Sequence, residues 1–266
     1  MERIKQALER AREERQHGGI YKTRRVWSPA TPELSIEFTE TRTLQLAPDV
    51  IDEQRLVATA EEGAMADAYR ILRTRVLQRM TGNGWRSIAI TSMTEHNGKT
   101  LTAVNLAISM AKEVNHTVLL VDLDLRRPNV GRCFSHEAAP GLSDHLLRGV
   151  PLSEILFSPG INRLVVLPGN EPLANSSEML SSPVMMRLIQ DLKTRYESRY
   201  IVFDMPTLMA TDDVLAFLPQ TDGVLLVVEE GRTLRQELAR VPELLQGTNL
   251  IGTVLNKSAD PVYKYY

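Results

Sequence analysis

Short apolar runs alternate with segments of helical period through most of the chain. Six runs have the length of a strand and lie near residues 87–92, 117–122, 163–167, 200–204, 223–228 and 250–255. Between and before them, the apolar spacing predicts helices near residues 64–80, 99–113, 142–157 (broken at Pro151), 182–196, 210–218 and 233–246. Continuously apolar strands that alternate with helices are typical of a parallel sheet covered on both faces. We therefore expect an α/β fold with a mostly parallel, doubly wound sheet.

The first part of the chain follows a different pattern. Residues 2–16 carry a narrow apolar stripe between mixed charges, which predicts an amphipathic helix. Residues 17–62 show no sustained period, and we interpret them as a linker. We accordingly divide the chain into a helix and linker over 1–62, a core domain over 63–258 and a tyrosine-rich tail over 259–266.

Composition narrows the class of protein. The chain has 266 residues, of which 43% are hydrophobic, so it can bury a full core. Its net charge of −2 gives no global basic field that would attract a nucleic acid. No apolar run approaches the ~20 residues of a membrane helix, so we expect no direct membrane insertion. Cys133 is the only cysteine, which excludes an internal disulfide and suits a reducing cytoplasm.

The stretch from Ser87 to Thr100 has the order that a phosphate-binding loop requires. An apolar strand leads into a loop that ends in Gly98-Lys99-Thr100, and a helical pattern follows at once. Loop amides and the helix N-terminus direct positive dipoles at an anion, a lysine reaches the terminal phosphates, and the threonine hydroxyl binds magnesium. Met93 stands where such loops usually have their first glycine.

Carboxylates also follow two other apolar strands. Asp122 and Asp124 end one run, and Asp204 ends another. In an open parallel sheet, ligands bind beyond the carboxyl ends of the strands. A single aspartate at a strand end often only begins a turn. Three strands that end in a phosphate loop, an Asp-x-Asp and an Asp-x-Pro would instead converge on one nucleotide and its magnesium.

Together these segments resemble the bacterial tyrosine kinases of exopolysaccharide and capsule loci. That family carries a Walker A loop, a Walker A′ strand and a Walker B strand in this order. The matching segments are Ser92…Gly98-Lys99-Thr100, Val121-Asp122-Leu-Asp124-Leu-Arg126-Arg127-Pro128 and Phe203-Asp204-Met-Pro206. The resemblance covers about residues 60–266. It implies a P-loop NTPase fold of the MinD/ParA type and a non-specific protein-tyrosine kinase that uses ATP and Mg²⁺.

The resemblance also implies a role for each matching residue. The nucleotide-binding residues would be Asn97, Gly98, Lys99, Thr100, Leu101 and Asn256, the last of these beside adenine. Thr100, Asp122 and Asp204 would hold magnesium. Asp122 and Asp124 would orient the metal and accept the tyrosine proton, and Lys99 would neutralise phosphate charge. The catalytic set is thus Lys99, Asp122, Asp124 and Asp204.

Assembly and partners follow from the same resemblance. The family's phosphoacceptors are tyrosines in a C-terminal cluster presented to a neighbouring subunit, and Tyr263, Tyr265 and Tyr266 match that placement. Asp67, Arg70 and Arg73 resemble a Glu-x-x-Arg-x-x-Arg subunit-contact motif, although an ordinary i,i+3 ion pair has the same spacing. The implied partners are further copies of the chain and a membrane chain-length determinant that activates it. The expected location is the cytoplasm, at the inner membrane through that partner.

Departures from the family leave alternatives open. Glu95 and His96 stand where relatives usually have proline and glycine, which fits a nucleotide-gated adaptor that binds ATP and turns it over little. A MinD/ParA-like ATPase shares the fold, but Thr94 stands where that family has its signature lysine. A GTPase would read guanine with Asn-Lys-x-Asp, and the aspartate after Asn256-Lys257 comes one residue late.

Overall fold

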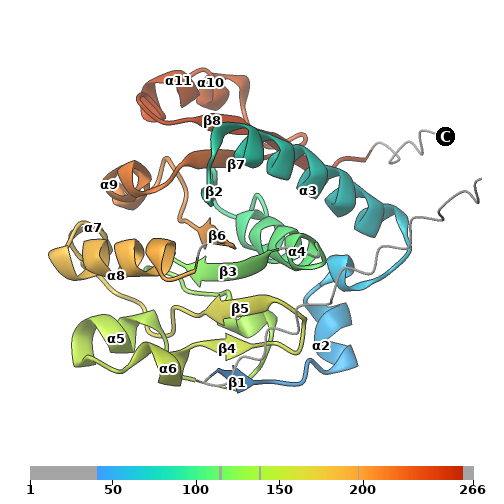
Figure 1. Cartoon of the computed structure of the whole chain (residues 1–266). Coiled ribbons are helices and arrows are strands. Elements are labelled where there is room, and N and C mark those ends of the chain that lie inside the picture. Colours follow the sequence, from blue (N-terminus) through green and yellow to red (C-terminus); the bar gives the residue numbers. More distant parts are fainter. Residues whose placement is uncertain (1–40, 114–115, 138, 197, 260–266) are drawn as a thin grey trace, which may run out of the picture. The chain divides into compact units, whose positions relative to one another are not determined.

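The computed structural model describes residues 41–113, 116–137, 139–196 and 198–259. These residues form an eight-stranded sheet with helices on both faces (Figure 1). The predicted helix over 2–16 and the three tail tyrosines lie outside the described residues. Within the described ranges, no helix has the length and apolar character needed to cross a bilayer.

The sheet is parallel except at one pairing. Its strands are β1 (Arg42–Thr43), β2 (Ser87–Ser92), β3 (Thr117–Asp122), β4 (Phe157–Ser158), β5 (Leu164–Leu167), β6 (Arg199–Asp204), β7 (Gly223–Glu229) and β8 (Leu250–Asn256). They lie in the order β1-β4-β5-β3-β6-β2-β7-β8. Only β4 and β5 run antiparallel to each other. The expected mostly parallel sheet is confirmed.

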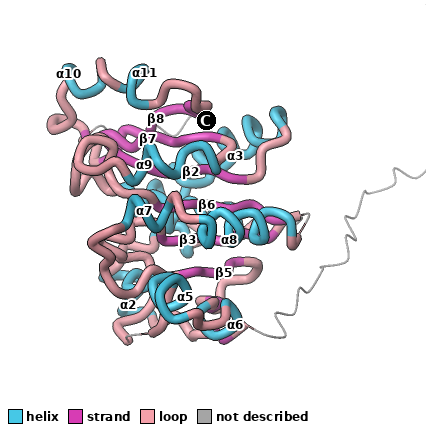
Figure 2. The backbone as a smooth tube through the Cα atoms, turned by 90° about the vertical axis from the view of Figure 1, so that its left-hand side faces the viewer, coloured by secondary structure: helices cyan, strands magenta, loops and turns pink. Residues whose placement is uncertain are grey.

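Two layers of helices cover the sheet. The helices are α2 (Pro48–Glu53), α3 (Ala64–Asn83), α4 (Lys99–Ala111), α5 (Leu142–Arg148), α6 (Leu152–Ile155), α7 (Ser176–Leu180), α8 (Pro183–Thr194), α9 (Asp213–Phe217), α10 (Arg235–Leu238) and α11 (Val241–Leu244). Helices α3 and α4 lie on one face, and Figure 2 looks onto the other face, with α5, α7 and α8 in front of the strands.

The alternation of side chains along the strands separates two apolar clusters. In β3, Leu119 and Val121 pack with α5, α7 and α8, whereas Val118 and Leu120 pack with α3 and α4. All four side chains are fully buried. Because both faces of a central strand are covered, its sequence is continuously apolar.

The described part of the predicted linker belongs to this fold. Residues 42–43 form β1 beside β4, and α2 precedes a short 3₁₀ turn over Val57–Thr59. Leu56 is buried, and the Ala58 amide donates to Asn105 Oδ1 on α4 at 2.9 Å. These pieces were not predicted because two to six residues are too short to reveal a period.

Other differences from the expected elements are local. The predicted helix over 142–157 is broken before Leu152, as expected at Pro151, and its last residue is the start of strand β4. The predicted helix over 233–246 is two four-residue turns, α10 and α11, with Pro242 at the first turn of the second. Proline has no amide hydrogen and clashes with a preceding helical turn, so it starts helices rather than continuing them.

Candidate active site

The carboxyl ends of β3, β6 and β2 meet at one edge of the sheet. Asp122 and Asp204 are register partners on neighbouring strands, and Ile90 of β2 pairs with Asp204 from the other side. The loop between β2 and α4 therefore begins beside both carboxylates. A cleft of about 900 Å³ opens here, lined among others by Lys99, Thr100 and Asp124.

The phosphate loop has the backbone shape of an anion cradle. Helix α4 begins at Lys99 directly after Gly98, so its first amides lack intrahelical partners and its positive end lies at the cleft. Gly98 has φ 88°, and a Cβ there would lie 2.2 Å from Asn256 Nδ2. Glycine is thus favoured by the backbone conformation, and a larger residue would displace the Asn256 side chain. His96 also has a positive φ, 64°.

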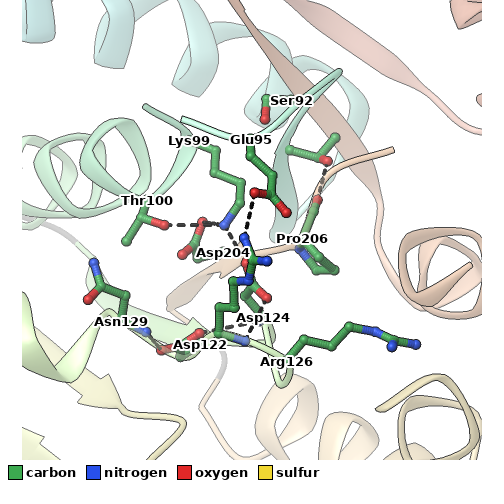
Figure 3. Close-up of polar contacts among 12 residues, drawn as sticks. Ser92, Glu95, Lys99, Thr100, Asp122, Asp124, Arg126, Asn129, Asp204 and Pro206 are labelled. Atoms are coloured by element: carbon green, nitrogen blue, oxygen red, sulfur yellow. Dashed lines mark hydrogen bonds and ion pairs between the residues drawn. The ribbon is translucent and has the colours of Figure 1, made fainter. Parts of the chain in front are cut away.

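Lys99 points at the carboxylates. Its Nζ lies 2.6 Å from Asp124 Oδ2, 3.3 Å from Thr100 Oγ1 and 3.9 Å from Asp204 Oδ1 (Figure 3). Burial by itself would lower the pKa of Lys99, but the attraction of Asp204 and Asp124 more than offsets it, so the pKa is raised. The lysine is therefore a permanent cation at the centre of the site.

Asp204 is the least satisfied group in the site. Its side chain is 1% exposed, and neither carboxylate oxygen has a hydrogen-bond partner among the described residues. Burial raises the pKa of Asp204, and the charge of Lys99 only partly opposes this. The Lys99 ammonium and the Thr100 hydroxyl are nearby but leave this buried carboxylate incompletely satisfied, which is costly unless a further cation or a coordinated water approaches it. Asp204 therefore fits the expected magnesium site.

The Asp122 carboxylate accepts hydrogen bonds from the loop that follows β3. Its Oδ2 accepts hydrogen bonds from the amides of Asn129 and Val130, both at 2.9 Å, and its Oδ1 accepts a 3.3 Å bond from the Asp124 amide. Burial and the nearby Asp204 charge raise the pKa of Asp122. These bonds shape the turn that presents Asp124, a task that the sequence did not reveal. Its metal-binding and proton-accepting roles stay predictions.

The described residues contain no group of three His, Cys, Asp or Glu side chains that could hold a metal ion by themselves. Magnesium usually keeps several waters and takes only one or two carboxylates together with substrate phosphates. One buried carboxylate and a threonine hydroxyl beside a phosphate loop match that preference.

Two ion pairs at this edge were missed by sequence reasoning. Arg126 donates to Asp213, which is fully buried and also accepts from Ser176 Oγ at 2.5 Å. Arg127 pairs with Glu95 across the cleft mouth at 2.5 Å. The first pair fixes the turn after Asp124 to α9 and α7. Both arginines belong to the Asp-x-Asp-x-Arg-Arg-Pro string, but their partners lie far away in sequence and carry no local signal.

The remaining predicted nucleotide residues surround the loop. Leu101 lines the cleft, whereas the side chain of Asn97 is fully buried and directed into the protein. Asn256 Nδ2 donates to the Asn97 carbonyl oxygen at 2.8 Å. Asn256 therefore packs against the phosphate loop itself, and its place beside adenine stays a prediction.

The predicted subunit-contact residues have partners within the chain. Arg70 pairs with Asp67 on α3 and donates to the Glu61 carbonyl oxygen at 2.5 Å. Arg73 lies 3.3 Å from Glu113 and donates to the Ser109 carbonyl oxygen of α4. The i,i+3 ion pair is thus present, and the role between subunits stays a prediction.

Comparison with known proteins defines the family. The profile of a family described as an AAA domain matches residues 85–258, so the chain belongs to that family. Tyrosine-protein kinase YwqD of Bacillus subtilis is 30% identical over 220 residues, which are 80% of this chain and 92% of that protein. The chain is a member of the bacterial tyrosine kinase family. Tyrosine-protein kinase CpsD of Streptococcus agalactiae serotype Ia is a second relative, 27% identical over 74% of this chain and 84% of its own length.

Solved structures agree with this assignment. The kinase domain of Escherichia coli tyrosine kinase ETK matches with a TM-score of 0.68 and 26% identity, over 85% of this chain and 93% of that one. The chimerical protein CapA2B2 matches with a TM-score of 0.71 and 26% identity, over 82% and 94%. The septum site-determining protein MinD of Pyrococcus horikoshii, complexed with Mg-ADP, shares the fold at 22% identity and a TM-score of 0.55, over 65% and 71%. The expected P-loop fold and family are confirmed.

Proposed function

We propose that this family member is an ATP-dependent protein-tyrosine autokinase that serves exopolysaccharide or capsule export. The convergence of Lys99, Asp124 and Asp204 beside a phosphate loop carries the proposal, because phosphoryl transfer depends mainly on positioning and on stabilising charge. The tyrosine-kinase relatives support the choice of acceptor. We propose the catalytic set expected from the sequence, which is Lys99, Asp122, Asp124 and Asp204.

The residues present fit ATP and Mg²⁺. The amides at the start of α4 and the Lys99 ammonium would bind the phosphates, and Asp204 with Thr100 Oγ1 would hold the metal. Bound magnesium would neutralise phosphate charge. When the Lys99 ammonium donates to a phosphate oxygen, it would no longer donate to Asp124. The Asp124 carboxylate would then be free to accept a proton.

The γ-phosphoryl group of ATP would then pass directly to the tyrosine. The tyrosine phenol oxygen attacks the γ-phosphorus of ATP, the bond to the β–γ bridging oxygen breaks, and ADP leaves. The phenol proton passes to Asp124. A phenol has a pKa near 10, so a carboxylate within reach assists the attack. We propose Tyr263, Tyr265 and Tyr266 of a neighbouring copy as the acceptors.

The partners follow from the relatives. The succinoglycan biosynthesis transport protein ExoP of Rhizobium meliloti is 31% identical over 77% of this chain, which covers 26% of ExoP. In that protein, a segment similar to this chain belongs to a much longer transport protein. We propose that this chain acts with a membrane protein of a polysaccharide locus, and that it forms a homo-oligomer joined through Asp67, Arg70 and Arg73.

Lys99→Met tests the assignment. Without the ammonium, affinity for magnesium–ATP measured by calorimetry should fall at least about tenfold, and phosphotyrosine located by mass spectrometry should disappear. Asp191→Asn, which alters an exposed ion pair on α8, is the control and should behave as the wild type. Unchanged affinity in folded Lys99→Met would contradict the site.

The nucleotide-gated adaptor remains a second candidate because of one observation. His96 occupies a strained backbone conformation inside the phosphate loop. Wild-type protein that binds ATP yet carries no phosphotyrosine after incubation with ATP and magnesium would favour the adaptor over the kinase.

A further inference from the structure

Three side chains meet at Glu229, the last residue of β7. Glu229 Oε2 accepts a hydrogen bond from Asn97 Nδ2 at 3.1 Å and lies 3.0 Å from Lys257 Nζ. Arg232 approaches the same oxygen at 3.7 Å. The Glu229 side chain is 12% exposed, whereas the side chains of Lys257 and Arg232 are about half exposed, so the cluster lies at the edge of the buried region. The carboxylate thus joins the phosphate loop to the residue that follows β8.

The phosphate loop is held at consecutive positions by this cluster. Asn97 is fully buried, and its Oδ1 accepts from the amide and the hydroxyl of Thr94, at 3.1 and 3.0 Å. Lys257 Nζ also donates to the His96 carbonyl oxygen at 2.8 Å. Asn97, which belongs to the loop, therefore binds Glu229 through its side chain. Lys257 binds both Glu229 and the backbone of His96 in the loop.

The loop needs such support because of its backbone. His96 has φ 64°, a conformation that is strained for a residue other than glycine and persists only where surrounding contacts enforce it. The contact from Lys257 is made at His96 itself, and the contact from Glu229 is made at the next residue. The strained conformation is thus enforced from the ends of β7 and β8.

We propose that Glu229 is a positioning residue that keeps the phosphate loop in its nucleotide-binding conformation through Asn97 and Lys257. Glu229 is not among the residues that line the cleft, so it acts through its two partners. The inference rests on the proposed function only in taking the loop as the nucleotide site. Hydrogen bonding to Lys257 lowers the pKa of Glu229, which keeps the carboxylate charged at neutral pH.

Glu229→Ala tests the role, with Glu230→Gln as a matched control. Glu230 is the next residue, and its carboxylate accepts from the Ala259 amide at 2.7 Å instead of contacting the loop. Glu229→Ala should weaken ADP and magnesium–ATP binding about tenfold by calorimetry, comparable to losing one charge-assisted hydrogen bond. In kinetics the KM for ATP should rise more than kcat falls. Glu230→Gln should bind as the wild type.

Two further variants separate positioning from general stability. In Asn97→Ala/Glu229→Ala the loss of affinity should be smaller than the sum of the two single losses, because the two side chains share one contact. In His96→Gly the added loss from Glu229→Ala should shrink, because glycine needs no enforcement at φ 64°. Additive losses in both tests would overturn the proposal and assign Glu229 to stability alone.

The outcomes also separate this proposal from the function itself. A wild type that binds no nucleotide would remove the proposed function. A wild type that binds nucleotide, together with a folded Glu229→Ala variant of equal affinity, would remove only the role of Glu229. Urea unfolding of each variant shows that it is folded under the conditions of the binding measurement.

Discussion

His96 shows how a single side chain can set the quality of a phosphate loop. Related loops usually have glycine at this position, where a positive φ costs nothing, and this chain keeps the positive φ with an imidazole that lines the cleft. Contacts from Lys257 and, through Asn97, from Glu229 hold the strained backbone of His96 in place. The loop is therefore a site where local conformation and tertiary contacts oppose each other.

His96→Gly should raise nucleotide affinity severalfold, because it relieves the backbone and opens room for the phosphates. Calorimetry with magnesium–ATP measures this. His96→Ala removes the imidazole but keeps the strained φ, so it separates bulk from conformation and should gain less. A large loss of affinity in both variants would mean that the imidazole itself binds phosphate.

The same scale shows what the sequence could reveal about the site. Lys99, Asp124 and Asp204 were predictable because each follows an apolar strand, and the ends of parallel strands meet at one edge. Glu229 was not, since it contacts Asn97 from 132 positions away and has no motif of its own. Partners that meet only through folding leave no periodic trace in the chain.

At the scale of elements, Asp222 joins three segments at the opposite end of the strands from the cleft. Its Oδ2 accepts from the amides of Arg86 and Ser87 at 2.9 and 2.8 Å, and from the Ser87 hydroxyl at 2.8 Å. Its Oδ1 lies 3.2 Å from Lys193 on α8. The residue thus ties the start of β2 to the start of β7, the strands that carry the loop and Glu229.

Asp222→Asn should destabilise the fold by about 1.5–3 kcal/mol at pH 7, the range for hydrogen bonds to a charged group. Burial alone would raise the pKa of Asp222, but its hydrogen bonds from Arg86 and Ser87 and the charge of Lys193 lower it from 3.8. The contribution is therefore present above pH ~4 and is lost as the pH falls through the lowered pKa of the folded state. Urea unfolding should show the two proteins converging below that pH. A constant difference would contradict this origin.

The elements that sequence reasoning identified are those long enough to show a period. Strands β2, β3, β5, β6, β7 and β8 and helices α3, α4 and α8 were predicted within a few residues. Strands β1 and β4 have two residues each and are set only by pairing with their neighbours. Helix α7 was missed because its five residues lie in a polar Ser-rich stretch.

At the scale of the whole molecule, helix α3 carries the residues of the proposed contact between copies of the chain. Arg70 and Arg73 flank its buried side, while Met65 and Ile71 are 53% and 47% exposed on the same helix. Exposed apolar residues beside arginines suit a contact surface. Because each arginine already has a partner within the chain, a subunit contact would add to or replace those bonds.

Arg70→Glu/Arg73→Glu should shift the protein to monomers in light scattering with ATP present, because both charges reverse at the proposed contact. Arg75→Glu/Arg79→Glu makes the same change in charge on the exposed side of α3 and should leave assembly intact. If the control dissociates equally, net charge rather than the motif governs association. A wild type that is monomeric under all these conditions would contradict the contact.

Ala259, whose amide donates to Glu230 Oε2, is the last described residue before the three tail tyrosines. A chain spans at most about 3.6 Å per residue, so Tyr263 can lie no more than about 14 Å from Ala259 and Tyr266 no more than about 25 Å. Any second copy that phosphorylates these residues must bring its cleft within that radius plus the length of a tyrosine side chain. The number of residues after Ala259 would therefore restrict the spacing of copies that phosphorylate each other, and a cleft too distant for Tyr263 could still accept Tyr266.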